Sequence, residues 1–158
     1  MPTPRLRISS CLTLLLAGCA LTDPEPPQAR VSPAALASVC PDELAGKPYY
    51  GNRELLGREH LKWFLSGMAN RPKYPRPAAA KGQPGVVLAA IAVSARGNVE
   101  GTSIVCAYPA AVFEQSVLQA VRANSYPVYQ KDGVALPYEI VVRFLFGAEG
   151  DDTLALRP

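Results

Sequence analysis

Apolar residues recur at helical spacing in two parts of the chain. The first part holds Leu55, Leu56, Leu61, Phe64, Leu65 and Met68. Asn52 can cap a helix there and Glu54 places negative charge in its first turn, so a helix is predicted over residues 53–69. Pro72 follows and prevents its continuation. The second part predicts a helix over residues 110–123, with one apolar side that packs on a sheet.

Three other segments have the pattern of β-strands. Residues 86–93 are apolar at every position and rich in β-branched side chains, which predicts a strand buried on both faces. Turn residues at 96–98 precede a returning strand over residues 99–107. Residues 138–146 follow the Asp132–Gly133 turn and alternate with a period of two. The order of elements predicts an α+β domain with a three-stranded antiparallel sheet packed against two helices.

The residues before and after this region have a different composition. Six prolines lie between residues 20 and 48, a density that favours extended backbone. We therefore expect a proline-rich tether over residues 19–51, before an N-terminal helical segment over residues 52–70. Residues 148–158 are expected to form a loose acidic tail.

The beginning of the chain has the features of an export signal. Two arginines precede the apolar stretch of residues 11–17, which is far shorter than the ~20 residues that span a bilayer. Residues 16–19, Leu-Ala-Gly-Cys, resemble the lipobox of bacterial lipoproteins. The resemblance implies removal of residues 1–18 as a signal peptide and lipidation, with palmitate among the acyl chains, of Cys19. The alternative is an ordinary secretory signal cut near Ala20.

A lipid on Cys19 would hold the protein on a membrane of the cell envelope, facing the periplasm. Enterobacterial lipoproteins retained in the inner membrane carry aspartate after the lipidated cysteine, and this chain carries Ala20 there. By that resemblance the outer membrane is favoured over the inner.

The remaining cysteines and the charge agree with an exported protein. Cys40 and Cys106 could pair in an oxidising periplasm, and closing a loop of about 66 residues would contribute roughly 4 kcal/mol. The alternative is that Cys106 is a small buried hydrophobe and Cys40 is free. Without Arg5 and Arg7 of the leader, 14 basic residues face 13 acidic ones. This balance argues against a nucleic-acid partner.

Catalytic and metal-binding patterns are missing from the sequence. It has no G-x-S-x-G segment, no Walker-type or dinucleotide-binding glycine loop and one histidine, His60. We expect His60 to be a solvated side chain and Trp63 to contribute to packing. The sequence therefore predicts neither an enzyme nor a bound cofactor or metal.

A family resemblance covers residues 71–146. The matching segments are Tyr74-Pro75 before an alanine-rich stretch, Gly85-Val86 at the start of a strand, Gly97-Asn98-Val99 in a turn, Phe113 and Val117 with residues 120–122 in a helix, and residues 133–146 at the last strand. Together they resemble the C-terminal domain of TonB, a periplasmic protein that couples inner-membrane energy to outer-membrane receptors. We therefore expect a TonB C-terminal-like domain over residues 71–147.

The chain departs from the family pattern at two places. Residues 124–127, Asn-Ser-Tyr-Pro, stand where the family has an aromatic-basic stretch with tryptophan, and Arg71 stands where well-known members have glutamine. TonB itself also begins with an inner-membrane helix that engages a proton-driven motor. With a lipobox in its place, this chain is not expected to supply energy in the known way.

The resemblance implies a protein-binding module. In the family, an extended receptor segment adds as a strand beside the last strand, because the edge of a sheet has unpaired N–H and C=O groups. The residues carried over to this role are Arg71, Lys73, Tyr74, Pro75, Ile140 and Val142, with backbone from about residue 139 to 144. The expected partner is an outer-membrane TonB-dependent receptor or another envelope protein. For Tyr74-Pro75, simple packing of the domain is an equal alternative.

A second interpretation belongs to a different class of protein. The same free edges would allow two copies to associate, which would make the chain a structural envelope lipoprotein that forms a homodimer.

Overall fold

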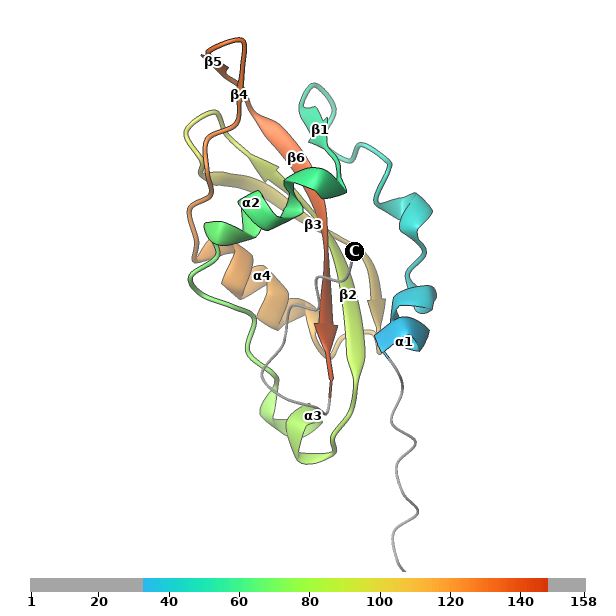
Figure 1. Cartoon of the computed structure of the whole chain (residues 1–158). Helices are drawn as coiled ribbons and strands as arrows, with labels where there is room; N and C mark the ends of the chain where they lie inside the picture. Colours follow the sequence, from blue (N-terminus) through green and yellow to red (C-terminus); the bar gives the residue numbers. More distant parts are fainter. Residues whose placement is uncertain (1–32, 148–158) are drawn as a thin grey trace, which may run out of the picture.

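Four strands form the central sheet of the protein, in the order β1-β6-β2-β3 (Figure 1). The computed structural model describes residues 33–147. The strands are β1 (Glu54–Leu56), β2 (Gly85–Val93), β3 (Val99–Tyr108) and β6 (Tyr138–Phe146). The long strands β2, β3 and β6 are mutually antiparallel, whereas β1 runs parallel to β6. The smaller elements are α1 (Pro33–Val39), η1 (Asp42–Leu44), η2 (Arg58–His60), α2 (Leu61–Ser66), α3 (Arg76–Ala80), α4 (Glu114–Arg122), β4 (Gln130–Lys131) and β5 (Val134–Ala135).

β2 is the buried centre of the fold. All nine of its residues are buried, as the unbroken apolar run predicts. Val87, Ala89, Ile91 and Val93 belong to the larger core cluster, with Phe64 of α2 and Val117 of α4. Val86 and Leu88 belong to a second cluster with Leu36 of α1. The sheet therefore has helices on both faces, which is why the central strand is apolar at every position.

The three strands predicted from the sequence are all present, and β6 begins and ends at the predicted residues. The α+β class is confirmed, but the count of three strands is wrong because β1 adds a fourth. Glu54, Leu55 and Leu56 pair with Tyr138, Glu139 and Ile140, respectively.

The helix predicted over residues 53–69 is wrong in its first half. Helical structure begins at Arg58 as a 3₁₀ turn, and α2 is only six residues long. Leu56 is 4% exposed and belongs to the main core cluster, and Gly57 follows with an extended backbone. Pairing with β6 and burial of Leu56 therefore override the helical spacing of the apolar residues.

The helix predicted over residues 110–123 begins later than expected. α4 begins at Glu114, whose carboxylate accepts hydrogen bonds from the amides of Ala111 (2.6 Å) and Phe113 (3.0 Å). These side-chain bonds give partners to two backbone N–H groups directly before α4, in place of hydrogen bonds within a longer helix. The apolar side of the helix is as predicted, with Val117 and Val121 buried on the sheet.

Residues 33–53, which we call the N-terminal strap, lie across the sheet face opposite α2 and α4 (Figure 1). A disulfide joins Cys40 to Cys106 of β3, with the two Cα atoms 5.8 Å apart, and this confirms the expected pairing. Leu36 is buried with β2 and β6 residues. The structure thus differs from the expected extended tether over residues 33–51.

Several sequence-based expectations lie outside the described residues. They concern the signal peptide over residues 1–18, lipidation of Cys19, the first part of the tether and the tail over residues 148–158. Within residues 33–147, none of the helices has the length and hydropathy needed to cross a bilayer.

Candidate strand-addition site

The outer edge of β6 is only partly covered by another strand. On one side, β6 pairs along its whole length with β2. On the other side, β1 pairs with Tyr138–Ile140 alone. In the described part of the chain, residues 141–146 therefore have a strand partner on one side only. Such a half-paired strand is the feature to which an extended peptide can add.

The direction of the backbone groups on this edge follows from one hydrogen bond. The amide of Glu54 donates to the carbonyl oxygen of Pro137 at 3.3 Å, so that carbonyl faces β1. Successive residues of a strand turn their N–H and C=O groups to opposite sides. The backbone groups of Glu139 then face β1, and those of Val141, Arg143 and Leu145 face the part of the edge beyond β1.

Two of the predicted peptide-binding residues have buried side chains. Ile140 is 1% exposed and Val142 is 0% exposed, and both belong to the core cluster under α2 and α4. An added strand could not touch these side chains. The strand to which the sequence assigns peptide binding thus has a half-paired side, and the groups of Ile140 and Val142 themselves are not on it.

Tyr74 lies beside the end of β6. Its ring stacks on Phe113 at a centroid distance of 5.7 Å and on Phe146 at 6.0 Å. Its hydroxyl donates to the carbonyl oxygen of Gln83 at 2.5 Å, and burial raises the pKa of the Tyr74 phenol. These contacts give Tyr74 a packing role and bring the Tyr74-Pro75 segment to the end of the candidate edge.

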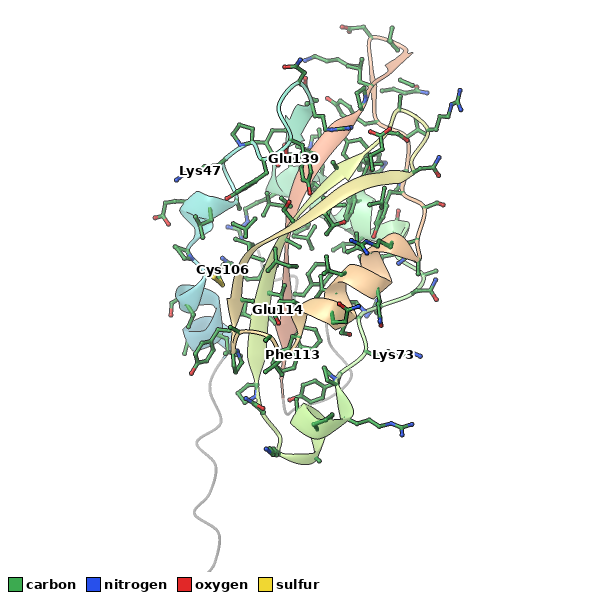
Figure 2. The ribbon with its side chains drawn as sticks, turned by 180° about the vertical axis from the view of Figure 1, so that it is seen from behind. Lys47, Lys73, Cys106, Phe113, Glu114 and Glu139 are labelled. Atoms are coloured by element: carbon green, nitrogen blue, oxygen red, sulfur yellow. A yellow bond between two sulfur atoms is a disulfide. The ribbon has the colours of Figure 1, made fainter. Side chains whose placement is uncertain are left out.

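Arg71 and Lys73 have exposed side chains, and hydrogen bonds fix the backbone of Lys73 and of Asn70, the residue before Arg71. The Ser116 hydroxyl of α4 donates to the carbonyl oxygen of Lys73. Asn124, a buried side chain, accepts a hydrogen bond from the amide of Asn70 and donates to its carbonyl oxygen, both at 2.8 Å. Figure 2 shows Lys73 pointing away from the sheet. The structure keeps both cations available on the surface near α4.

Glu139 of β6 makes a buried contact with the strap that the sequence patterns did not predict. It is 1% exposed, and its carboxylate accepts hydrogen bonds from the backbone amides of Tyr49 (2.8 Å) and Tyr50 (2.9 Å). Figure 2 shows Glu139 between the strap and the sheet. These two bonds give each carboxyl oxygen of this buried side chain a hydrogen-bond partner. The available signal was an acidic residue in β6, a strand whose other charged residue is Arg143.

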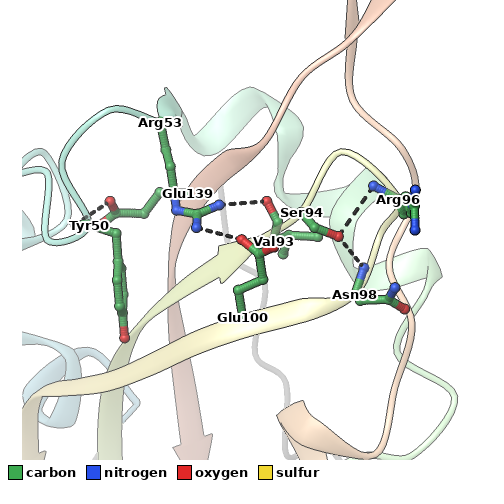
Figure 3. A network of polar contacts seen from close by, with 8 residues as sticks. All are labelled: Tyr50, Arg53, Val93, Ser94, Arg96, Asn98, Glu100 and Glu139. Carbon is green, nitrogen blue, oxygen red and sulfur yellow. Dashed lines mark hydrogen bonds and ion pairs between the residues drawn. The ribbon is translucent and has the colours of Figure 1, made fainter.

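A polar network holds the end of the strap next to the β2–β3 turn (Figure 3). The Arg53 guanidinium contacts the Glu100 carboxylate at 2.5 Å and donates to the carbonyl oxygen of Val93 at 3.2 Å. The Ser94 hydroxyl oxygen accepts from the amides of Arg96 and Asn98. An open hollow of about 710 Å³ is lined by residues of this network, among them Arg53, Ser94 and Glu100. The network fixes the strap immediately before β1.

The single histidine of the chain, His60, takes part in a surface ion pair and in aromatic packing. His60 contacts the Glu59 carboxylate at 2.9 Å and packs edge-on against Tyr129 and Trp63. Backbone hydrogen bonding, followed by the contact with His60, holds the pKa of Glu59 below its ordinary value. Trp63 packs against the core, as expected. Within residues 33–147, no three His, Cys, Asp or Glu side chains gather closely enough to hold a metal ion.

Residues 70–147 match the family model described as the Gram-negative bacterial TonB protein C-terminal. None of the curated proteins matches the chain. Among solved structures, the TonB C-terminal domain of Pseudomonas aeruginosa is 26% identical over 51% of this chain and 81% of that chain, with a TM-score of 0.42. A Helicobacter pylori TonB C-terminal domain is 17% identical over 61% and 87%, with a TM-score of 0.45. The TonB2 protein of Vibrio anguillarum is 21% identical over 64% and 92%, with a TM-score of 0.41.

Proposed function

Because residues 70–147 belong to the TonB C-terminal domain family, we propose that this protein is a lipid-anchored periplasmic adaptor that binds an extended segment of an envelope protein by strand addition. Domains of this family are periplasmic, non-enzymatic interaction modules that contact outer-membrane receptors or other envelope proteins. The partner proposed here is an outer-membrane TonB-dependent receptor or transporter. The protein assists transport across the envelope without supplying energy.

One observation carries the proposal: the half-open edge of β6. Residues 141–146 are paired with β2 and, among the described residues, with no strand on the other side. A peptide that adds there gains main-chain hydrogen bonds, with Val141 and Leu145 among the residues supplying the backbone groups. Tyr74 and Pro75 lie at the end of this edge, since the Tyr74 ring stacks on Phe146. Arg71 and Lys73 would place positive charge near an incoming peptide.

The proposed anchor is a lipid on Cys19, which holds the adaptor on the outer membrane. The lipobox at residues 16–19 supports it, and the disulfide between Cys40 and Cys106 agrees with an oxidising compartment. Incorporation of labelled palmitate into the wild-type chain, and its loss in Cys19→Ala, would test the anchor. Palmitate that remains in Cys19→Ala would contradict it.

Peptide binding is tested most directly at Val141, because its amide faces the outer edge. Val141→Pro removes that amide and leaves the hydrogen bonds to β2 in place, as proline allows on an edge. Val141→Ala shortens the same side chain and keeps the amide. With the full chain in detergent and a fluorescent peptide from a receptor's energy-coupling segment, we expect micromolar binding to wild type and Val141→Ala. Val141→Pro should bind at least ~10-fold more weakly, the effect of losing about one main-chain hydrogen bond and the register that it fixes.

Circular dichroism and thermal unfolding of both variants are the folding controls. Equal binding by Val141→Pro and Val141→Ala would show that the peptide does not add to β6. Val142→Pro would be a poor test, because the Val142 side chain is in the core and its backbone groups face β2.

A second candidate is a structural envelope lipoprotein whose domain self-associates. The observation in its favour is the outer edge of β3, a ten-residue strand that pairs, among the described residues, with β2 alone. Two copies could join through these edges. Sedimentation equilibrium distinguishes the candidates, because a stable dimer that binds no receptor peptide favours self-association, and a monomer that binds the peptide favours the adaptor.

A further inference from the structure

β1 occupies part of the edge that a partner strand would use. It pairs with Tyr138–Ile140, directly before the half-open residues 141–146 of the same strand. We propose that β1 is an internal ligand of the β6 edge, which an incoming strand must displace in order to pair along the whole of β6. This inference rests on the proposed strand addition and concerns its regulation by the chain itself.

The contacts of β1 are few and specific. Leu56 is buried in the core cluster, whereas Glu54 and Leu55 are partly exposed. Glu54 forms an ion pair with Lys131 at 2.9 Å, in which both side chains are more than a third exposed, and solvent weakens such a pair. The hydrogen bond with Glu54 raises the pKa of Lys131. A three-residue strand held mainly by one buried leucine can open locally while the rest of the fold stays intact.

The strap keeps β1 close to the edge even when β1 opens. The Glu139 carboxylate binds the amides of Tyr49 and Tyr50, and the Arg53 guanidinium binds the last residue of β2 and Glu100 of β3. Cys40 is bonded covalently to β3. β1 begins at Glu54, the next residue after Arg53. A displaced β1 therefore remains tethered at an effective concentration on the order of millimolar, and competes with any strand added from outside.

The competition sets the apparent affinity of the partner. The apparent dissociation constant equals the intrinsic constant divided by the fraction of molecules whose edge is open. If β1 leaves the edge in about one molecule in ten, a partner that needs the whole edge binds about tenfold more weakly than it would without β1.

A matched pair of proline variants tests the proposal. Glu54 donates its amide to Pro137, so Glu54→Pro removes a hydrogen bond between β1 and β6. The amide of Leu55 faces away from β6 by strand alternation, so Leu55→Pro places proline one residue later without removing such a bond. The probe is a fluorescent peptide with the sequence of residues 52–58, added to the full chain. We expect it to bind Glu54→Pro about tenfold more tightly than wild type or Leu55→Pro.

Amide exchange measured by NMR supplies the second readout. The amide of Glu139 faces β1, so Glu54→Pro should speed its exchange about tenfold or more, and the added peptide should restore its protection. Glu54→Lys, which places two cations together, should give a smaller gain in the same direction and serves if Glu54→Pro does not fold. Unchanged peptide affinity in folded variants whose Glu139 amide exchanges faster would overturn the proposal.

The outcomes separate this inference from the proposed function. Binding of the residue 52–58 peptide to Glu54→Pro supports the internal ligand, whether or not a receptor peptide binds. Receptor peptide that binds wild type and Glu54→Pro equally, with no binding of the 52–58 peptide, supports strand addition and overturns the internal ligand.

Discussion

The disulfide between Cys40 and Cys106 gives the prediction with the best-defined magnitude. The bond joins the strap to β3 across a sequence separation of 66 residues. In the chain-entropy treatment, a loop of this length lowers the entropy of the unfolded state by an amount worth about 4 kcal/mol at room temperature. Reduction should therefore lower the free energy of unfolding by about 4 kcal/mol, and the melting temperature by about 15 °C for a domain of this size.

Chemical denaturation of oxidised and reduced wild-type protein measures this difference directly. The double variant Cys40→Ala, Cys106→Ala serves as a control for incomplete reduction. Cys40 is fully buried, so loss of its sulfur adds roughly 1 kcal/mol of cavity cost to the variant. Mass spectrometry before and after thiol alkylation confirms the redox state.

Amide exchange shows where the stability is lost. If the strap depends on the disulfide, the amides of Tyr49 and Tyr50, which donate to Glu139, should exchange faster after reduction. A loss below about 1 kcal/mol, with these amides still protected, would refute the reasoning, because it would mean that burial of Leu36 and the Glu139 bonds hold the strap without the covalent link.

Three other predictions test particular contacts. Gly97→Ala should lower the free energy of unfolding by about 2 kcal/mol or more, because the φ of Gly97 is +82° and a Cβ there would lie 2.2 Å from the carbonyl oxygen of Tyr126. Gly133→Ala is the control, since Gly133 has a φ of +78° in open space, and it should lower the free energy of unfolding in urea by only about 1 kcal/mol. Equal losses in the two variants would exclude the contact with Tyr126 as the cause. Glu139→Gln, which offers one carbonyl oxygen to two amide donors, should destabilise by about 1–3 kcal/mol and speed exchange of the Tyr50 amide, and unchanged exchange would contradict the assigned bonds. Burial raises the pKa of Tyr126 and Tyr138, so these phenols keep their protons in the folded state at a pH at which the unfolded chain loses them. The free energy of unfolding should therefore fall as pH rises above about 10. A constant free energy of unfolding above that pH would contradict the burial of the two phenols.

Local pattern was sufficient for the elements whose own residues decide their structure. The period of two in residues 138–146 gives β6, since alternate side chains of a strand face opposite sides of the sheet. The unbroken apolar run gives β2, and the apolar side of α4 follows from helical spacing. The turn at Gly97 follows from glycine's access to positive φ. The number of cysteines left after the proposed lipid site made the disulfide one of two alternatives, and the structure has it.

For the candidate site, too, the sequence indicated one part and the tertiary structure decided the rest. Residue types in the Tyr74-Pro75 segment and the last strand indicated the region of the edge, and the structure brings Tyr74 to the end of β6. The side chains of Ile140 and Val142 proved to be buried, because sequence alone does not say which face of an alternating strand a helix covers. Nor does it say which backbone groups of β6 stay without a partner, since that depends on the register with β1 and β2.

The sequence by itself determined that a buried central strand, two antiparallel neighbours and a packed helix form one α+β core, because those patterns lie within each segment. Only the tertiary structure decided the conformation and the packing of residues 33–56. Their prolines and helical spacing indicated a tether and a helix, yet Leu36 and Leu56 are buried on opposite faces of the sheet and Glu139 binds the backbone between them. Long-range burial and pairing outweigh local propensities of a few tenths of a kcal/mol per residue, and no local pattern reports them.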